Sequence, residues 1–176
     1  MVNFRVLILS IMAALVCTGC GMKTHKSYAF SEPEFHLNSG SIHAKLRGTM
    51  LNIDDVTSVS RGPYEMLLWF KLNAASDLDG CLVSLTGMTL KNTETDDLVP
   101  ISKIVTATFR QKPDGGFIAS INIKNLHLLY ADHEMRFVYS FNDNCGLIEA
   151  PSSVSMVFVK DYSERKISFW DVLMGI

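Results

Sequence analysis

The stretch Tyr64–Leu72, YEMLLWFKL, decides the fold class of this chain. Every second residue in it is large and apolar, namely Tyr64, Met66, Leu68, Phe70 and Leu72. Successive side chains of a β-strand point to opposite faces, so these residues share one face. A continuous apolar face of this kind indicates a strand that covers a hydrophobic core. The stretch therefore predicts a half-buried strand.

The same period of two recurs along the chain between turn signals rich in Gly, Pro, Asn and Asp. Beyond the N-terminal segment, no long window carries a helical period of 3.6 residues, and only Leu126–Glu134 favours one short helical turn. The strands that we expect are His43–Leu51, Tyr64–Leu72, Leu82–Leu90, Val105–Arg110, Phe117–Ile123, Met135–Phe141, Val154–Phe158 and Lys166–Trp170.

About eight strands of this length are typical of an all-β domain. We expect an antiparallel β-sandwich with an immunoglobulin- or transthyretin-like layout, and a small β-barrel is the alternative. Two hairpins are expected within it. One has its turn at Pro113–Gly116, and the other has its turn at Asp161–Arg165.

The chain begins with a segment that is typical of an export signal. Arg5 precedes Val6–Val16, VLILSIMAALV, which contains no charged residue. This apolar run is too short to span a membrane as a helix, and it fits the core of a secretory signal peptide. Two small residues, Thr18 and Gly19, then lead to Cys20.

Residues 1–22 resemble the signal peptide and lipobox of bacterial lipoproteins, in which small residues precede an invariant cysteine. The resemblance implies that Cys20 is lipidated and that the signal peptide is cleaved before it. Cys17 stands where the family usually has Leu, and Cys17 with Cys20 also forms C-x-x-C. A redox or metal pair is therefore the alternative, but it would need a folded site that lowers the thiol pKa.

The same resemblance implies where the protein is found. Gly21, instead of Asp, after the lipidated cysteine implies the outer membrane of a Gram-negative bacterium, with the domain facing the periplasm. The chain then divides into a signal peptide at 1–19, a lipidated N-terminus and tether at 20–33, and a single β-sandwich domain at 34–176.

Two further cysteines, Cys81 and Cys145, lie in the expected domain. Export to an oxidising compartment favours a disulfide between them, and two buried free thiols are the alternative. Cys81 follows a turn signal and Cys145 lies within one. The bond would therefore connect loops at one end of the sandwich.

The sequence contains no motif that indicates catalysis or a cofactor. It has neither the G-x-S-x-G of elbow-type hydrolases nor the H-E-x-x-H of zinc hydrolases. His127 and His133 match no common metal-ligand spacing, and Asp77–Gly80 begins like a calcium loop but lacks the Glu at its twelfth position. We therefore expect no catalytic residue, no metal and no cofactor. The formal net charge of −2 gives no basic surface for nucleic acid.

Two tryptophans fall on the faces of their strands opposite the main apolar set. Trp69 and Trp170 are either the second face of a central strand or part of an exposed aromatic patch for a partner. The apolar end of the chain, 169–176, is either a paired last strand or a docking segment.

These features favour a non-enzymatic lipoprotein that is held at the membrane by its lipid and binds or supports the assembly of another envelope protein. In layout the chain is similar to lipoproteins that assist secretion assemblies, such as the type VI secretion lipoprotein and the type III pilotins. One alternative is an immunity or inhibitor lipoprotein against a toxin or enzyme. Another is a small-ligand carrier or an envelope enzyme.

Overall fold

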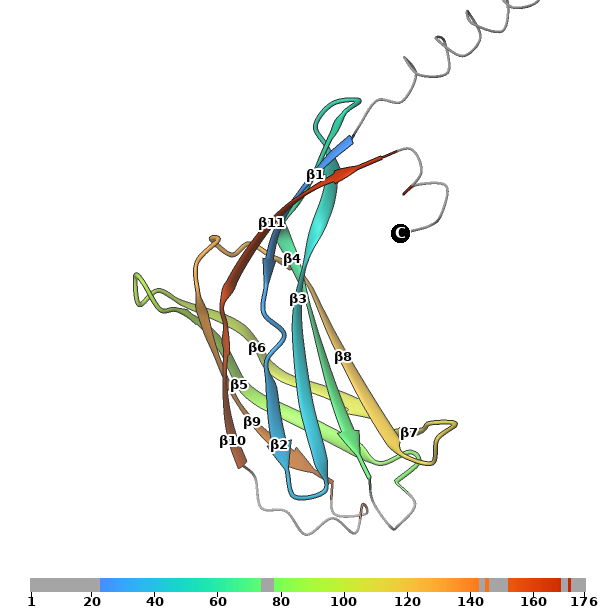
Figure 1. Ribbon diagram of the computed structural model, residues 1–176. Coiled ribbons are helices and arrows are strands. Elements are labelled where there is room, and N and C mark those ends of the chain that lie inside the picture. Colours follow the sequence, from blue (N-terminus) through green and yellow to red (C-terminus); the bar gives the residue numbers. More distant parts are fainter. Residues whose placement is uncertain (1–22, 74–77, 143–144, 146–151, 169–170, 172–176) are drawn as a thin grey trace, which may run out of the picture.

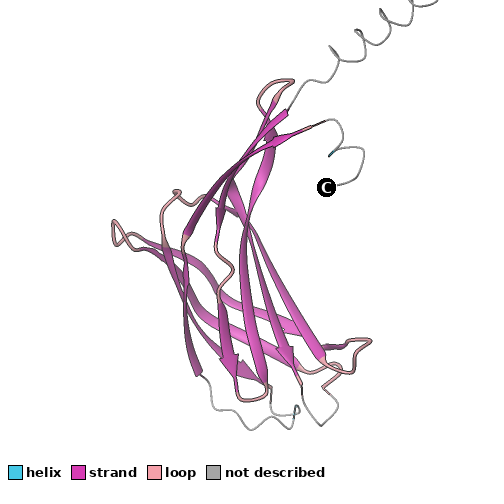
Figure 2. Ribbon diagram, in the orientation of Figure 1, coloured by secondary structure: helices cyan, strands magenta, loops and turns pink. Residues whose placement is uncertain are grey.

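Two β-sheets form the protein in the computed structural model (Figure 1). The structure describes residues 23–73, 78–142, 145, 152–168 and 171. Figure 2 shows that long strands joined by loops make up these residues. The strands are β1 (Lys23–Phe30), β2 (Glu34–Leu37), β3 (Gly40–Asn52), β4 (Thr57–Leu72), β5 (Leu82–Asn92), β6 (Leu98–Thr108), β7 (Arg110–Gln111), β8 (Phe117–Leu126), β9 (His133–Phe141), β10 (Ser152–Phe158) and β11 (Lys160–Ile167).

The first sheet has the order β11-β1-β4-β3-β2, with β8 also paired to β4 and β7 to β8, and the second has the order β10-β9-β5-β6. Among the described strands, β1 and β4 pair in parallel and all other pairs are antiparallel. The predicted all-β class is confirmed. The strands that the sequence pattern did not predict are β1, β2, β7 and the part of β11 before Lys166.

The core lies between the two sheets and is built from alternating side chains. The predicted apolar face of β4, from Tyr64 to Leu72, is at most 2% exposed. The ring of Phe70 meets two rings of the second sheet, with centroid distances of 6.5 Å to Phe137 and 5.9 Å to Tyr139. Burial of one such side chain contributes roughly 1.5–3 kcal/mol. The stretch YEMLLWFKL is thus the centre of the fold.

The β3–β4 hairpin takes part in two regions. Its half with Gly40–Gly48 and Tyr64–Leu72 lies in the sandwich, where β8 pairs with β4. Its other half, Thr49–Asn52 with Thr57–Arg61, extends beyond the sandwich, where β4 pairs with β1, which in turn pairs with β11. We call this four-stranded extension the arm and the two-sheet sandwich the body. The arm is at the top of Figure 1.

The tether expected at residues 20–33 is wrong for Lys23–Phe30, because this segment is strand β1. Its sequence, KTHKSYAF, shows no apolar alternation apart from Tyr28 and Phe30. The strand is instead held by backbone pairing on both edges, to β11 along its whole length and to β4 from Thr24 to Ser27. Both partners lie far away in the sequence, so no local pattern predicted the pairing.

The hairpin expected at Asp161–Arg165 is also wrong. Strand β11 runs through this segment in the first sheet, whereas β10 belongs to the second sheet. The chain crosses between the sheets at Val159, whose carbonyl accepts the Ser31 N–H at 2.9 Å. Polar residues on both faces resemble a turn in sequence, but they also suit an exposed edge strand.

Two further expectations are corrected near β8. The turn at Pro113–Gly116 is confirmed, and the Lys112 N–H donates to the Gly116 carbonyl at 2.7 Å. The strand that pairs across it is the short β7, because β6 lies in the other sheet. The helical turn expected in Leu126–Glu134 is wrong, since this segment is the end of β8, an extended loop at 127–132 and the start of β9. Its apolar residues line a cavity instead of a helix face.

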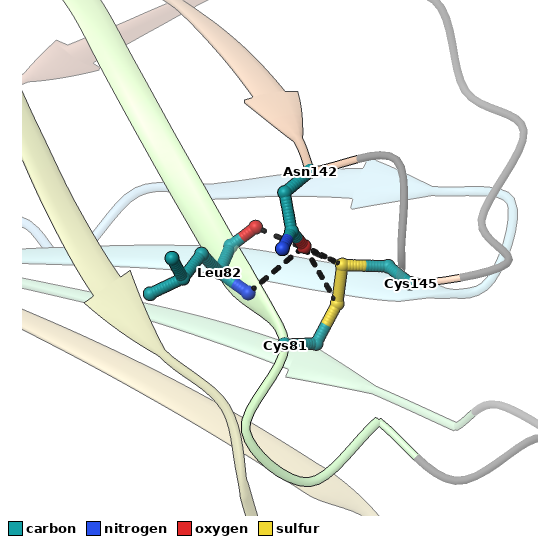
Figure 3. Close-up of a disulfide and its surroundings, with 4 residues drawn as sticks. All are labelled: Cys81, Leu82, Asn142 and Cys145. Carbon is teal, nitrogen blue, oxygen red and sulfur yellow. Dashed lines mark hydrogen bonds between the residues drawn. A yellow bond between two sulfur atoms is a disulfide. The ribbon is translucent and has the colours of Figure 1, made fainter.

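A disulfide joins Cys81 and Cys145, with their Cα atoms 5.4 Å apart (Figure 3). The predicted pairing is thus present in the structure. Cys81 precedes β5 and Cys145 follows β9, and these strands are neighbours in the second sheet. Beside the bond, the Asn142 N–H donates to the Leu82 carbonyl at 3.1 Å, and the Leu82 N–H donates to Oδ1 of the Asn142 side chain at 3.2 Å. The disulfide therefore fastens one end of a single sheet, as expected from its position in turns.

The described residues contain no helix that is long and apolar enough to cross a membrane.

Candidate functional site: an aromatic cavity between arm and body

A cavity of about 560 Å³ opens where the arm meets the body. Strand β1 contributes Tyr28, and the middle of β4 contributes Arg61–Tyr64. The β8–β9 loop contributes His127–Tyr130. A cavity of this size lies within the range of about 300–1,000 Å³ that is typical of ligand sites. Three segments that are distant in sequence therefore build one concave surface.

A bulge in β4 shapes one wall of the cavity. Gly48 pairs with Tyr64 and the next residue, Thr49, pairs with Arg61, so Gly62 and Pro63 have no opposite residue in β3. The Gly62–Pro63 peptide bond is cis. Bulges commonly redirect side chains beside binding sites. Gly62 and Pro63 have the composition of a turn in the sequence, but in the structure they are the point where β4 passes from body to arm.

Gly48 is required opposite this bulge. A Cβ atom at this position would lie 2.9 Å from the Arg61 backbone nitrogen, which is closer than real Cβ contacts. The absence of a side chain thus lets β3 follow the bulged strand closely.

Aromatic rings pack around the cavity. Tyr28 lies edge-on to Tyr130, with centroids 5.1 Å apart, and Phe30 lies 5.2 Å from Tyr64 and 5.6 Å from Tyr130. Such edge-to-face pairs contribute about 0.5–1.5 kcal/mol beyond the area they bury. The Tyr64 hydroxyl donates to the Tyr28 carbonyl at 3.2 Å. The rings therefore hold β1 of the arm against β4 and the β8–β9 loop.

One polar atom of the cavity lining and one next to the lining retain unused hydrogen-bonding capacity. The Tyr130 hydroxyl and Nδ1 of His133 are buried without a partner among the described residues. His133 donates through Nε2 to the Leu129 carbonyl at 3.0 Å. Burial raises the pKa of Tyr64 and of Tyr130, so both phenols stay protonated. The Tyr64 proton is already donated to the Tyr28 carbonyl, which leaves the Tyr130 hydroxyl as the unused donor.

Arg61 supplies a fixed positive charge at the cavity. Its guanidinium has no carboxylate partner in the part of the chain that the structure describes. A guanidinium with five donors beside aromatic rings suits a carboxylate that is attached to an apolar or aromatic group. The cavity is thus chemically equipped to bind a ligand.

The histidines considered in the sequence analysis are placed differently from each other. His127 lines the cavity and is exposed, whereas His133 is 2% exposed and packs 6.0 Å from the Phe30 ring. Within residues 23–73, 78–142, 145, 152–168 and 171, no group of three His, Cys, Asp or Glu side chains is arranged to hold a metal ion. Asp77 lies outside the described residues, and Asp79 and Gly80 form a turn before Cys81.

The remaining sites of the sequence analysis lie away from the cavity. Cys20, Trp170 and most of the chain end at 169–176 fall outside the described residues. Trp69 is half-buried on the outer face of the first sheet, between His43 of β3 and Ser120 of β8. The Cys81–Cys145 disulfide lies before the start of β5 and after the end of β9, and in Figure 1 these strand ends are at the end of the body away from the arm. Sequence reasoning missed the cavity because Tyr28, Arg61 and Tyr130 lie in segments without apolar alternation.

No family model matches this sequence, and no curated protein matches it. Among solved structures, the chain is similar to a copper-bound variant of FetP from uropathogenic Escherichia coli, with a TM-score of 0.33 and 12% sequence identity. The similarity covers 81% of this chain and 96% of that chain. A similarity of this size supports no inference about function.

Proposed function

We propose that this chain is a non-enzymatic binding lipoprotein of the cell envelope, anchored through Cys20 and facing the periplasm. Its aromatic cavity binds a segment of another envelope protein. The segment that suits the site carries an aromatic or aliphatic side chain next to a carboxylate. The rings receive the apolar group, and Arg61 receives the charge.

One observation carries this proposal: three tyrosines and an arginine line a single open cavity, namely Tyr28, Tyr64, Tyr130 and Arg61. Tyr and Arg are enriched among the residues that dominate binding energy at protein interfaces. Tyrosine supplies a large contact area with few rotatable bonds, so ordering it on binding costs little entropy. Tyr64 also belongs to the core and is 2% exposed, whereas Tyr28 and Tyr130 are half-buried and Arg61 is exposed, so these three can reach a ligand.

The position of the cavity along β1 supports a partner near the membrane. Tyr28 is the fifth residue after Lys23, which corresponds to about 17 Å at the rise of a β-strand. Because the lipidated Cys20 lies just before β1, the cavity is held within a short distance of the bilayer. A binding site at this height suits the support of an assembly in the same membrane.

Photo-crosslinking in intact cells tests the proposal. A photoreactive amino acid at Leu129, which is 67% exposed beside the cavity, is expected to form an adduct with one envelope protein. Ile104 is 66% exposed on β6 of the other sheet and is the matched control position. In the same cells, Arg61→Ala should reduce the Leu129 adduct. Equal adducts at both positions, or none at Leu129, would overturn the proposal.

The identity of the crosslinked protein separates two forms of this function. A secretion or assembly component indicates a support role, and a toxin or enzyme indicates an immunity or inhibitor role. The volume of the cavity also favours a second candidate, a small-ligand carrier. Native mass spectrometry of the protein extracted from cells detects this case as an added mass that Arg61→Ala removes.

A further inference from the structure

The tip of the arm exposes a group of apolar side chains. Met50 is 66% exposed, Ile53 is 55% exposed and Val56 is 51% exposed, and Leu51 beside them is 37% exposed. They surround the turn between β3 and β4, at the far end of the arm from the body. Exposed apolar groups that are contiguous mark interaction sites, whereas single ones are ordinary. We call these four residues the tip patch.

The turn that carries the tip patch is well bonded. The Ile53 N–H donates to the Thr57 carbonyl at 2.9 Å, and the Val56 N–H donates to Oδ1 of Asp54 at 2.8 Å. The Thr24 N–H of β1 donates to the Val56 carbonyl at 2.7 Å. The tip is therefore fixed directly to the first residues of β1.

The chain itself places this tip beside the proposed lipid anchor. Thr24 is the fourth residue after Cys20, and an extended chain of this length spans at most about 14 Å. If Cys20 is lipidated, as the proposed function requires, Thr24 lies within this distance of the bilayer surface. The tip patch, which is bonded to Thr24, then lies at most about one side-chain length farther away. The lipid on Cys20 holds the tip next to the bilayer, so a lipid surface is the partner that we assign to the tip patch.

Charged residues around the tip are compatible with a membrane surface. Lys23 and Lys26 of β1 and Arg165 and Lys166 of β11 lie on the strands next to the turn. Glu164 is opposite Lys26, and Arg165 is paired with Asp171 at 3.7 Å, so Lys23 and Lys166 are the basic groups nearest the tip. Long basic side chains can keep their charge in the headgroup layer while their methylene groups cover apolar surface. Asp54 is engaged with the turn backbone, and its neighbour Asp55 is exposed. Such a tip suits shallow contact with headgroups more than deep insertion.

We propose that the tip patch inserts into the interfacial layer of the bilayer that holds the lipid anchor. This inference rests on the proposed lipidation of Cys20. Two contacts, the lipid and the tip, fix the arm upright on the membrane. The aromatic cavity is then presented at a defined height, whereas an anchor alone would let the domain tilt freely.

Fluorescence quenching on vesicles tests the insertion. The acylated mature protein is purified with Ile53→Cys and labelled with the environment-sensitive dye NBD. The label reacts only there because Cys81 and Cys145 are bonded and Cys20 carries the lipid. The protein is incorporated into vesicles of phosphatidylethanolamine and phosphatidylglycerol that contain nitroxide-labelled lipid. We expect a blue-shifted emission that the nitroxide quenches.

Two further labelling positions control the measurement. Asp114→Cys lies in the β7–β8 turn at the opposite end of the body and should show neither shift nor quenching. Val56→Cys repeats the test if Ile53→Cys fails to fold, and it should behave as Ile53→Cys does. Unquenched label at both tip positions on vesicle-bound protein would overturn the insertion while leaving the anchor intact. Mature protein without acyl chains, shown by mass spectrometry, would instead overturn the proposed function.

Discussion

The body and the arm share one hairpin but are stabilised in different ways. In the body, β4 presents an unbroken apolar face to the second sheet, and every residue of that face is buried. In the arm, the same strand reads Thr57–Arg61, TSVSR, and only Val59 is buried. The body is thus held by side-chain packing, and the arm is held by strand pairing with few buried side chains. The difference shows that a strand can extend beyond its core where neighbouring strands satisfy its backbone.

The same substitution in the two regions should have very different costs. Leu68→Ala removes a fully buried side chain of the body and should lower the free energy of unfolding by about 2–5 kcal/mol. Leu51→Ala on the paired strand of the arm, where the side chain is 37% exposed, should cost less than about 1 kcal/mol. Urea unfolding followed by circular dichroism measures both values. Equal costs would contradict the division into body and arm.

Removal of the disulfide should have the next largest effect. The double variant Cys81→Ala with Cys145→Ala opens a link between residues 64 apart in sequence and should cost about 2–4 kcal/mol. Urea unfolding of the oxidised protein gives the reference value. Because the bond is at the end of the body away from the arm, crosslinking from Leu129 should be unchanged. A lost adduct in a protein that is still folded would show that body and cavity are coupled.

The hydrogen bond between Tyr64 and Tyr28 connects arm and body. Its removal should lower the free energy of unfolding by less than removal of the disulfide does. Tyr64→Phe removes the donor to the Tyr28 carbonyl and should cost about 0.5–1.5 kcal/mol. Tyr162→Phe is the matched control, because its hydroxyl bonds the exposed Glu164 within the arm. The control should change the unfolding free energy by less than about 0.5 kcal/mol. If Tyr162→Phe lowered the unfolding free energy more than Tyr64→Phe, the Tyr64–Tyr28 hydrogen bond would not be the link between arm and body.

The smallest predicted effect is a dependence of stability on alkaline pH. Burial raises the folded-state pKa of Tyr64, so the unfolded chain loses this proton first as the pH rises. Its contribution is therefore complete below the unfolded-state pKa of about 10 and is lost above it. Unfolding free energies measured across this range should fall less steeply for Tyr64→Phe than for the unsubstituted chain. Parallel curves would show that Tyr64 is solvated in the folded protein.

Local alternation predicted the strands that border the core. The expected strands within β3, β4, β5, β8, β9 and β10 are present, and each has one apolar face. The period of two arises because that face is buried in the core. The pattern failed for β1 and β11, whose stability comes from backbone pairing between polar segments at opposite ends of the chain. Backbone hydrogen bonds do not depend on side-chain type, so they leave no periodic signal.

The candidate site was hidden for a related reason. Its residues come from β1, the β4 bulge and the β8–β9 loop, and no two of these segments are adjacent in sequence. Arg61–Pro63 had the composition of a turn, and only the pairing of β3 with both sides of it shows a bulge. The expectation of a binding module was reached from the N-terminal segment instead of from the site.

The sequence by itself determined the all-β class, the position of the main core strands and the pair of cysteines available for a disulfide. These properties depend on local chemistry: alternation, turn residues and the number of thiols in the domain. Only the tertiary structure decided that β4 divides between body and arm, that β1 and β11 complete the arm, and that Tyr28, Arg61 and Tyr130 meet in a cavity. These depend on contacts between residues far apart in the chain, which form only once the sheets have paired.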